Sequence, residues 1–235
     1  MSAAAVFVEN RWMERHVAAL RGDQRVIFAP PGIDTGYYCP DSHVLRAHVL
    51  FVGRIDDPRK NVELLLQAYT RCLPHLRGEL PRLVLAGYSG PTAKLKGTIA
   101  TLGISHLVDV RLRVTPEDLR QLYRSARVFA LPSNEEGLGV VLIEALACAT
   151  PVVSTDCGGP STVVEHGVNG LLVPVGNVEA FALALETLLN DRDAAARMGE
   201  TGRARVAEHH SLPAAGRRFL AAYDRFGGVR GREAI

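Results

Sequence analysis

The segment from Ser133 to Ala147 organises this chain and reads SNEEGLGVVLIEALA. It lies between two short apolar runs, 128–131 and 150–154, which are typical of buried strands. A strand, a loop of small residues, an apolar helix and a second strand together predict one unit of an α/β sheet with parallel strands. Because the loop follows the carboxyl end of a strand, it lies where such sheets bind their ligands.

Two features of this segment predict a ligand site. Gly137 and Gly139 flank Leu138 at the start of the helix, where glycines let a ligand approach the backbone and free N–H groups suit a phosphate. Glu144 lies in a helix that is otherwise apolar on every side, and a buried carboxylate is costly unless a partner bonds to it. A ribose, with its paired hydroxyls, would be such a partner. A salt bridge to an arginine elsewhere in the chain is the alternative.

The segment also resembles a family signature. Glu136 and Glu144 are separated by seven residues, and flanking residues between Pro132 and Val153 agree with the same pattern. The run closely resembles the E-x7-E signature of GT-B glycosyltransferases of family 4, which are retaining, metal-independent enzymes with nucleotide-sugar donors. The resemblance implies that Glu144 takes the ribose hydroxyls and that Glu136 lies near the donor sugar. It also implies that the amides of residues 137–139 face the sugar and the phosphates.

A second motif comes directly after the strand predicted at 48–52, where residues 53–61 read GRIDDPRKN. Its composition fits a phosphate site, and it fits equally a solvated loop in which the two aspartates neutralise the two arginines. The resemblance favours the phosphate site, because the family has an arginine just after this strand and a lysine six positions later, matched by Arg54 and Lys60. It implies that both cations hold the donor pyrophosphate and stabilise the departing diphosphate without a metal.

The remaining candidate positions leave a weaker record in the sequence. Gly87 ends the strand predicted at 82–86, where it permits close backbone approach to a nucleoside or simply forms a turn. By resemblance, the backbone around Val114 contacts the base and Ser133 shapes the loop. The catalytic residues so implied are Arg54, Lys60 and Glu136, and the donor-binding residues are Gly53, Gly87, Val114, Ser133, Gly137, Leu138, Gly139 and Glu144.

Two places depart from the family pattern. Ala149 stands where the family usually has a glycine, and we expect this change to cost little at a helix end. Ser161 and Thr162 stand where the family often has proline and glutamate, so a contact made by that glutamate is not carried over.

The composition is that of a globular protein without a strong net charge. The 235 residues are 47% hydrophobic and 22% charged, and a net charge of +2 gives no electrostatic argument for nucleic acid. The four cysteines show no C-x-x-C spacing, and no signal peptide or long apolar run is visible, so we expect a cytoplasmic protein. The triplet Asp191 to Asp193 spells D-x-D at a predicted helix start, which favours capping over manganese binding. We expect no metal and no cofactor besides the donor substrate.

Alternating strands and helices predict a Rossmann-like, doubly wound parallel sheet, and the resemblance implies that this sheet is the C-terminal half of a GT-B fold. By resemblance, residues 1–40 are interpreted as the remnant of an N-terminal GT-B domain plus a linker, with Trp12, Val17 and Leu20 pointing inward from a helix. Residues 41–210 are the nucleotide-sugar-binding domain, and 211–235 a C-terminal helix and frayed tail. In the second domain the predicted strands are 48–52, 82–86, 107–112, 128–131, 151–154 and 170–173, and the predicted helices are 61–72, 94–102, 116–125, 139–149, 161–165 and 178–189.

Together these features predict the donor-binding half of a glycosyltransferase, which transfers a hexosyl group from a nucleoside diphosphate sugar to an acceptor hydroxyl with retention. The family carries its acceptor site in an N-terminal domain, so we expect this chain to need that missing domain, or a partner subunit, for activity. Peripheral membrane contact, through a lipid or glycan acceptor, is compatible with this reading. A non-catalytic nucleotide-sugar-binding subunit and a nucleotide-sugar epimerase are the alternatives. The third glycine of the dinucleotide fingerprint is missing after Gly139, which disfavours an NAD-dependent oxidoreductase.

Overall fold

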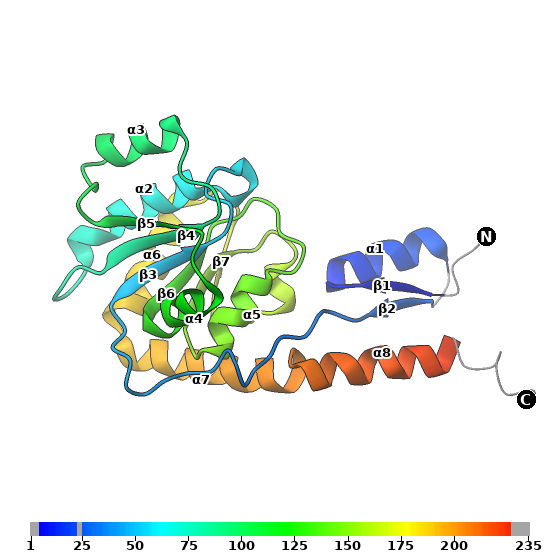
Figure 1. Ribbon diagram of the computed structural model, residues 1–235. Helices are drawn as coiled ribbons and strands as arrows, with labels where there is room; N and C mark the ends of the chain where they lie inside the picture. The colour runs from blue at the N-terminus through cyan, green and yellow to red at the C-terminus, as the bar shows by residue number, and fades with distance from the viewer. Residues whose placement is uncertain (1–4, 23–24, 227–235) are drawn as a thin grey trace, which may run out of the picture.

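The structure is a computed structural model that describes residues 5–22 and 25–226 (Figure 1). Its larger sheet has six strands, all parallel, in the order β5-β4-β3-β6-β7-β8. This order confirms the predicted Rossmann-like sheet, and it reverses between the neighbours β3 and β6. The strands are β3 (His48–Val52), β4 (Arg82–Gly87), β5 (Val108–Leu112), β6 (Ala126–Leu131), β7 (Val152–Thr155) and β8 (Gly170–Val173).

Helices cover both faces of this sheet, as parallel strands require. On one face α2 contacts α3 and α6, and on the other α5 contacts α4 and α7. The central strands are accordingly buried on both sides: Leu50 and Phe129 are fully inaccessible to solvent. The helices are α2 (Val62–Cys72), α3 (Ala93–Thr101), α4 (Pro116–Ser125), α5 (Val140–Ala147), α6 (Val178–Asn190) and α7 (Arg192–His209).

One predicted helix, at 161–165, is wrong. The structure has only a single 3-10 turn there, η3 (Pro160–Thr162). The side chain of Asn169 accepts a hydrogen bond from Glu165 N at 2.7 Å and donates one to Val163 O at 3.0 Å. The fully buried Asn169 side chain therefore bonds to backbone groups that a continuing helix would use for its own hydrogen bonds. Because Asn169 lies outside residues 161–165, the local sequence does not reveal this competition.

A smaller unit precedes the main domain. Strands β1 (Val6–Val8) and β2 (Val26–Phe28) form a parallel pair, connected by α1 (Arg11–Arg21). Figure 1 shows that α8 (Leu212–Phe226) runs from the main domain along this unit, where Phe7 and Phe219 have ring centroids 5.1 Å apart. The chain passes between the two parts twice, and the two crossing segments lie side by side: Ile33 N donates to His210 O, and Leu212 N donates to Ile33 O.

The predicted inward face of α1 is wrong. Trp12 is 55% exposed and Leu20 is 75% exposed, and α1 has no buried residue. The amphipathic pattern assumed that a second layer covers this face, and none of the described residues supplies one. The frayed tail predicted at the C-terminus lies beyond Phe226, outside the described residues. None of the described helices combines the length and apolar character that a bilayer span requires.

The expectation that Ala149 costs little is also wrong. Ala149 ends the turn after α5 with φ at 53°, in the left-handed region, where a Cβ atom is unfavourable. Glycine relieves this strain, although it loses more conformational freedom on folding than alanine. The family's usual glycine therefore has a backbone reason at this position.

We predict that Ala149→Gly stabilises the protein by about 1 kcal/mol, because relief of the left-handed strain exceeds the entropic cost of glycine. Urea unfolding at equilibrium measures the change. Ala147→Gly is the matched control, since Ala147 lies within α5, where glycine should destabilise by about 1 kcal/mol. An Ala149→Gly variant no more stable than the parent would contradict the prediction.

Two buried histidines make stability depend on pH. Burial lowers the pKa of His48 to about 4, aided by the nearby Arg111, and burial likewise lowers the pKa of His210 to about 4. An unfolded histidine titrates at about pH 6.5. Between about pH 6.5 and pH 4, therefore, these histidines are protonated in the unfolded chain and neutral in the folded chain. Stability should therefore fall with falling pH, by at most about 1.4 kcal/mol per pH unit for each histidine.

Urea unfolding at pH 7, 6 and 5 tests this expectation. His48→Asn removes one of the two groups, so the loss of stability on acidification should be shallower in this variant than in the parent. Identical slopes in both proteins would show that His48 does not carry the effect.

Candidate functional site

A cavity of about 340 Å³ lies at the point where the strand order reverses. In open α/β sheets, this crevice at the carboxyl ends of the strands is the usual ligand site. The lining comes from the loop after β3 (Arg54, Arg59 and Lys60), the loop after β6 (Glu135–Gly137), the loop after β7 (Gly158 and Gly159) and the start of α1 (Asn10, Trp12 and Met13).

An ion pair joins two of these loops across the cavity. Lys60 Nζ lies 2.5 Å from Glu136 Oε2, and the two side chains are only 18% and 15% exposed. Backbone contacts hold the loops in register, because Asn134 N donates to Arg59 O at 2.7 Å. The structure therefore brings Lys60 and Glu136, 76 positions apart in the sequence, into direct contact.

The two arginines of the first loop share one aspartate. Asp57 pairs with Arg54, and its Oδ2 lies 2.9 Å from Arg59 Nη2. The bond from Arg59 is the main reason that the pKa of Asp57 falls to about 2. Asp56 instead accepts a hydrogen bond from Ser89 Oγ at 2.5 Å. The predicted alternative, in which both aspartates neutralise the two arginines, is thus right for Asp57 and wrong for Asp56. The guanidiniums of Arg54 and Arg59 both remain more than half exposed.

Glycines in the loops after β6 and β7 pack closely against the chain itself, and at Gly159 the neighbouring atoms are backbone, which leaves no room for a side chain. A Cβ atom on Gly137 would overlap the carboxylate of Glu9, and one on Gly159 would overlap the backbone of Glu136 and Gly137. Gly139 has φ at 83° and is the N-cap of α5 without a side-chain hydrogen bond. The first turn of α5 therefore keeps N–H groups without a capping side chain, as an anion site at a helix start requires.

Glu144 has a partner that the sequence reading did not consider. The hydroxyl of Tyr123 donates to its Oε2 at 2.7 Å, and neither a ribose nor an arginine is needed to satisfy it. Burial raises the pKa of Glu144, while hydrogen bonds from Tyr123 and Tyr38 oppose that rise. Glu144 does not line the 340 Å³ cavity. A carboxylate has about four acceptor positions, so capacity for another donor remains.

The other candidate positions are not among the residues that line the cavity. A Cβ atom on Gly87 would overlap Gly53 O, so close packing between the ends of β3 and β4 accounts for this glycine, and the predicted alternative of a turn is wrong. Leu138 is 2% exposed. Val114 follows Arg113, which has φ at 53° and lies over the ring of Tyr88. Ser133 is fully buried and its carbonyl accepts from Thr155, which fits a residue that shapes the loop.

Sequence reasoning missed the contribution of the N-terminal unit. Asn10, Trp12 and Met13 line the cavity from the start of α1, and no local pattern around them points to a ligand. Gly158 and Gly159 did leave a signal, since a glycine pair in the loop after a strand indicates close backbone approach. No cluster of three or more potential metal-ligating side chains occurs within residues 5–22 and 25–226.

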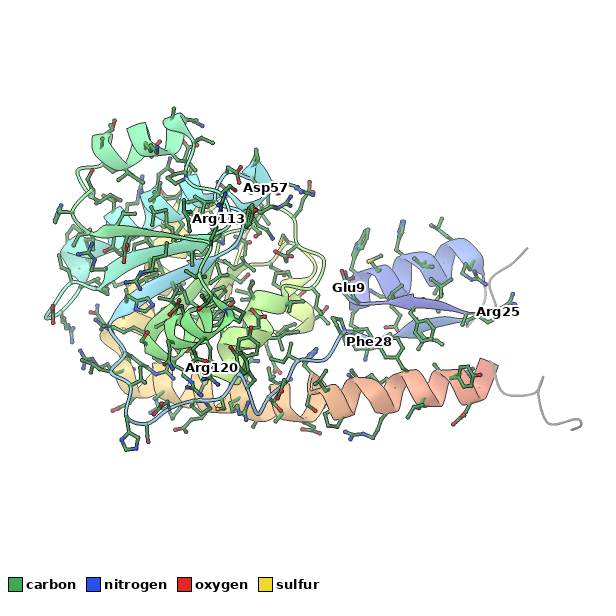
Figure 2. All side chains as sticks on the ribbon, in the orientation of Figure 1. Glu9, Arg25, Phe28, Asp57, Arg113 and Arg120 are labelled. Carbon is green, nitrogen blue, oxygen red and sulfur yellow. The ribbon has the colours of Figure 1, made fainter. Side chains whose placement is uncertain are left out.

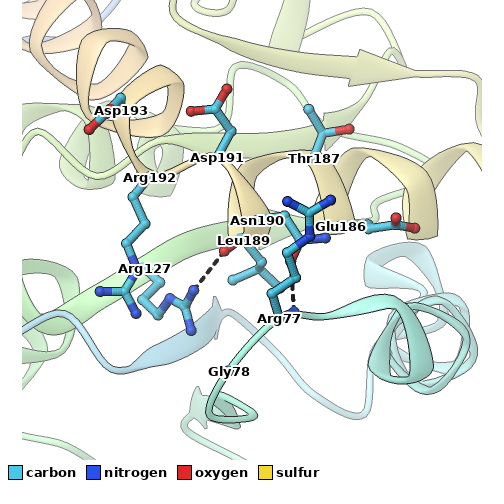
Figure 3. A pocket seen from close by; sticks show the side chains of 10 residues that line it. All are labelled: Arg77, Gly78, Arg127, Glu186, Thr187, Leu189, Asn190, Asp191, Arg192 and Asp193. Carbon is cyan, nitrogen blue, oxygen red and sulfur yellow. Dashed lines mark hydrogen bonds between the residues drawn. The ribbon is translucent and has the colours of Figure 1, made fainter.

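A larger cavity, of about 800 Å³, lies at the amino ends of the strands (Figure 3). Its polar side chains tie chain segments together: Arg127 Nη2 donates to Leu189 O at 2.7 Å, and Asn190 Oδ1 accepts from Arg77 N at 2.9 Å. Asp191 caps α7 through Ala194 N, which confirms capping for the D-x-D triplet. These contacts account for the polar groups structurally, so we place the candidate site at the opposite edge of the sheet.

Comparison with known proteins gives consistent relatives. The sequence is 40% identical over 191 residues to a D-inositol 3-phosphate glycosyltransferase of Nocardia farcinica, covering 74% of this chain and 42% of the relative. It is 32% identical over 197 residues to an MMP alpha-(1->4)-mannosyltransferase of Mycolicibacterium hassiacum, covering 83% and 47%. The chain thus spans about half the length of the curated relatives it matches.

Solved structures agree on the fold. The sucrose-phosphate synthase of Thermosynechococcus elongatus superposes with a TM-score of 0.83 at 27% identity, over 95% of this chain and 58% of that one. The C-terminal domain of a glycosyl transferase group 1 family protein of Francisella tularensis gives a TM-score of 0.69 at 17% identity, over 77% of this chain and 100% of that one. The sequence profile described as glycosyl transferases group 1 matches residues 45–205, and the chain belongs to this family.

Proposed function

We propose that this chain is the donor-binding half of a retaining glycosyltransferase, which transfers a hexosyl group from a nucleoside diphosphate sugar to an acceptor hydroxyl without a metal. The observation that carries the proposal is the Lys60–Glu136 pair at the carboxyl ends of β3 and β6, beside two further guanidiniums and the uncapped start of α5. This arrangement offers cations and N–H groups to a diphosphate at a site that α/β sheets commonly use for nucleotides.

In the proposed reaction the charge develops on the departing diphosphate. Lys60 and Arg54 stabilise that charge as the bond between the sugar and the diphosphate breaks, which lowers the barrier without a metal ion. Glu136 lies beside Lys60 and contacts the donor sugar, and Glu144 accepts hydrogen bonds from the ribose through the acceptor capacity that Tyr123 leaves unused. The backbone near Val114 receives the base.

We further propose that the acceptor groups come from a domain or partner chain that covers the N-terminal unit. In support, α1 presents Trp12 and Leu20 at 55% and 75% exposure, and β1 and β2 form a sheet of only two strands. Exposed apolar side chains on a small unit are typical of a surface that another layer covers. Titration with the partner, or joining that domain, should bury these two side chains.

Ligand binding to the chain tests the donor site directly. UDP, GDP and ADP, and inorganic pyrophosphate as a fragment, are compared by thermal shift and calorimetry on the parent, Lys60→Met and Glu144→Gln. One nucleoside diphosphate at 100 times its Kd should stabilise the parent by about 2.7 kcal/mol. Lys60→Met should weaken both the nucleotide and pyrophosphate, whereas Glu144→Gln should weaken only the nucleotide. The absence of any diphosphate response in the parent would refute the proposal.

A further inference from the structure

Three consecutive residues at the start of α1 contact the loops that follow β6 and β7. Asn10 Nδ2 donates to Gly137 O at 2.6 Å, and Arg11 N donates to Thr162 Oγ1 at 3.4 Å. Glu9 packs against Gly137 so closely that a Cβ atom there would overlap its carboxylate. Figure 2 shows Glu9 at the edge of the N-terminal unit that faces the main domain. Through this short segment, the N-terminal unit directly contacts the backbone of the candidate donor loop.

The side chain of Asn10 makes two hydrogen bonds, one to the backbone of its own helix and one to the main domain. Its Oδ1 accepts from Met13 N at 2.7 Å and so caps α1, while its Nδ2 donates across to the main domain. Asn10 is only 4% exposed, so water does not compete freely for either bond. Capping needs only the oxygen, and serine or aspartate would cap equally well. The N–H donor of an asparagine is therefore explained by Gly137 and not by the helix.

The loop that Asn10 holds is fastened on its other side by the main domain. Glu136 forms a parallel bridge with Gly158, and Gly159 packs against the carbonyls of Glu136 and Gly137. A displacement of Gly137 therefore moves its neighbour Glu136, whose carboxylate reaches Lys60 at 2.5 Å. Hydrogen bonds weaken steeply as their geometry departs from the ideal, so a small displacement alters the Lys60–Glu136 pair.

We infer that Asn10 is a positioning residue: its bond to Gly137 holds the backbone of residues 135–138, and with it Glu136, whenever the N-terminal unit lies against the main domain. The inference rests on the proposed function for its effect on ligands, but its effect on the loop does not. Donor binding then depends on how the two parts of the chain are docked, because Asn10 belongs to one part and Glu136 to the other.

Asn10→Asp tests the bond while keeping the cap. The aspartate retains the oxygen that accepts from Met13 N, loses the donor, and turns an oxygen toward Gly137 O. Hydrogen exchange in the unliganded protein should become at least about tenfold faster at the amides of residues 135–138, with β3 and β6 unchanged. Asn177→Asp is the matched control, because Asn177 caps α6 through Ala180 N from an exposed position. Unchanged exchange in the loop of Asn10→Asp would overturn the inference.

Binding of UDP, GDP and ADP provides the second measurement. The nucleoside diphosphate that binds the parent should bind Asn10→Asp about five- to tenfold more weakly, because the backbone N–H groups of residues 137 and 138, which the proposed function directs at the phosphates, are no longer held in place. It should bind Asn177→Asp normally, and Asn10→Ser, which also caps α1 without reaching Gly137, should match Asn10→Asp. Loop loosening with unchanged affinity would overturn the positioning role. If no diphosphate binds the parent, the proposed function fails, and the exchange measurement still decides whether Asn10 holds the loop.

Discussion

Glu136→Gln is expected to strengthen the binding of UDP, GDP or ADP, whichever binds, whereas Lys60→Met is expected to weaken it. In the structure the Lys60 ammonium is bound to the Glu136 carboxylate at 2.5 Å, so an arriving diphosphate competes with that carboxylate and is repelled by it. Glutamine removes the negative charge and keeps the shape. Methionine removes a cation that would make a charge-assisted hydrogen bond, a loss of about tenfold to a hundredfold in affinity.

Calorimetric titration with the free diphosphate measures both changes, and the opposite signs are the informative result. For Glu136→Gln a gain of about threefold to tenfold is expected from removing one nearby charge of the same sign. Glu63→Gln is the control, because Glu63 pairs with Lys94 on the surface and should leave affinity unchanged. If both site variants weaken the diphosphate equally, Glu136 contacts the ligand directly and does not compete with it for Lys60.

Arg46→Met is expected to destabilise the fold by about 3 kcal/mol or more, because it removes a buried cation that serves four acceptors. Arg46 Nη1 donates to Ala126 O and Thr150 Oγ1, at 2.8 and 2.7 Å, and Nη2 donates to Cys148 O and Ala149 O, at 2.9 and 3.0 Å. These carbonyls end α4 and α5, where the last carbonyls of a helix lack partners of their own. Burial also lowers the pKa of Arg46, which marks the guanidinium as desolvated.

Equilibrium unfolding in urea measures the loss. Arg46→Lys should recover only part of it, since a single ammonium cannot span the acceptors that the planar fork reaches. Arg71→Met is the surface control: Arg71 pairs with Glu179 in an exposed position, and such pairs contribute less than about 1 kcal/mol. A loss below about 1 kcal/mol for Arg46→Met would show that other donors satisfy these carbonyls.

The sequence predicted the main domain well because its signals are local. Most strands of the larger sheet are short apolar runs, and most of the helices that follow have a recognisable start, such as Thr115 with Pro116 before α4. The strand ends agree with the structure to within two residues. Arg54 and Lys60 line the cavity, and it was the resemblance to the family, not the composition of their loop, that indicated these two residues.

The features that the sequence did not reveal depend mostly on contacts between distant residues. Asn10 meets Gly137 across 127 positions, and Tyr123 satisfies Glu144 from a different helix, so neither contact leaves a periodic pattern. The exposure of Trp12 was missed for a related reason, since an apolar stripe indicates that a face is covered but not by what. The strain at Ala149 was missed because composition does not report a dihedral angle.

The paired crossing at Ile33 and Ser211 has a consequence for how such proteins are assembled. The main domain is joined to the rest of the chain by two segments that lie side by side at an isolated bridge between Ile33 and Ser211, where Ile33 N donates to His210 O at 2.8 Å. The beginning and the end of the domain therefore meet at one point. Residues 34–210 can therefore be exchanged between related proteins as one piece, because the two points at which the chain must be rejoined lie next to each other. Such an exchange would have to preserve the contact between Asn10 and Gly137, since this contact joins the exchanged piece to the N-terminal unit.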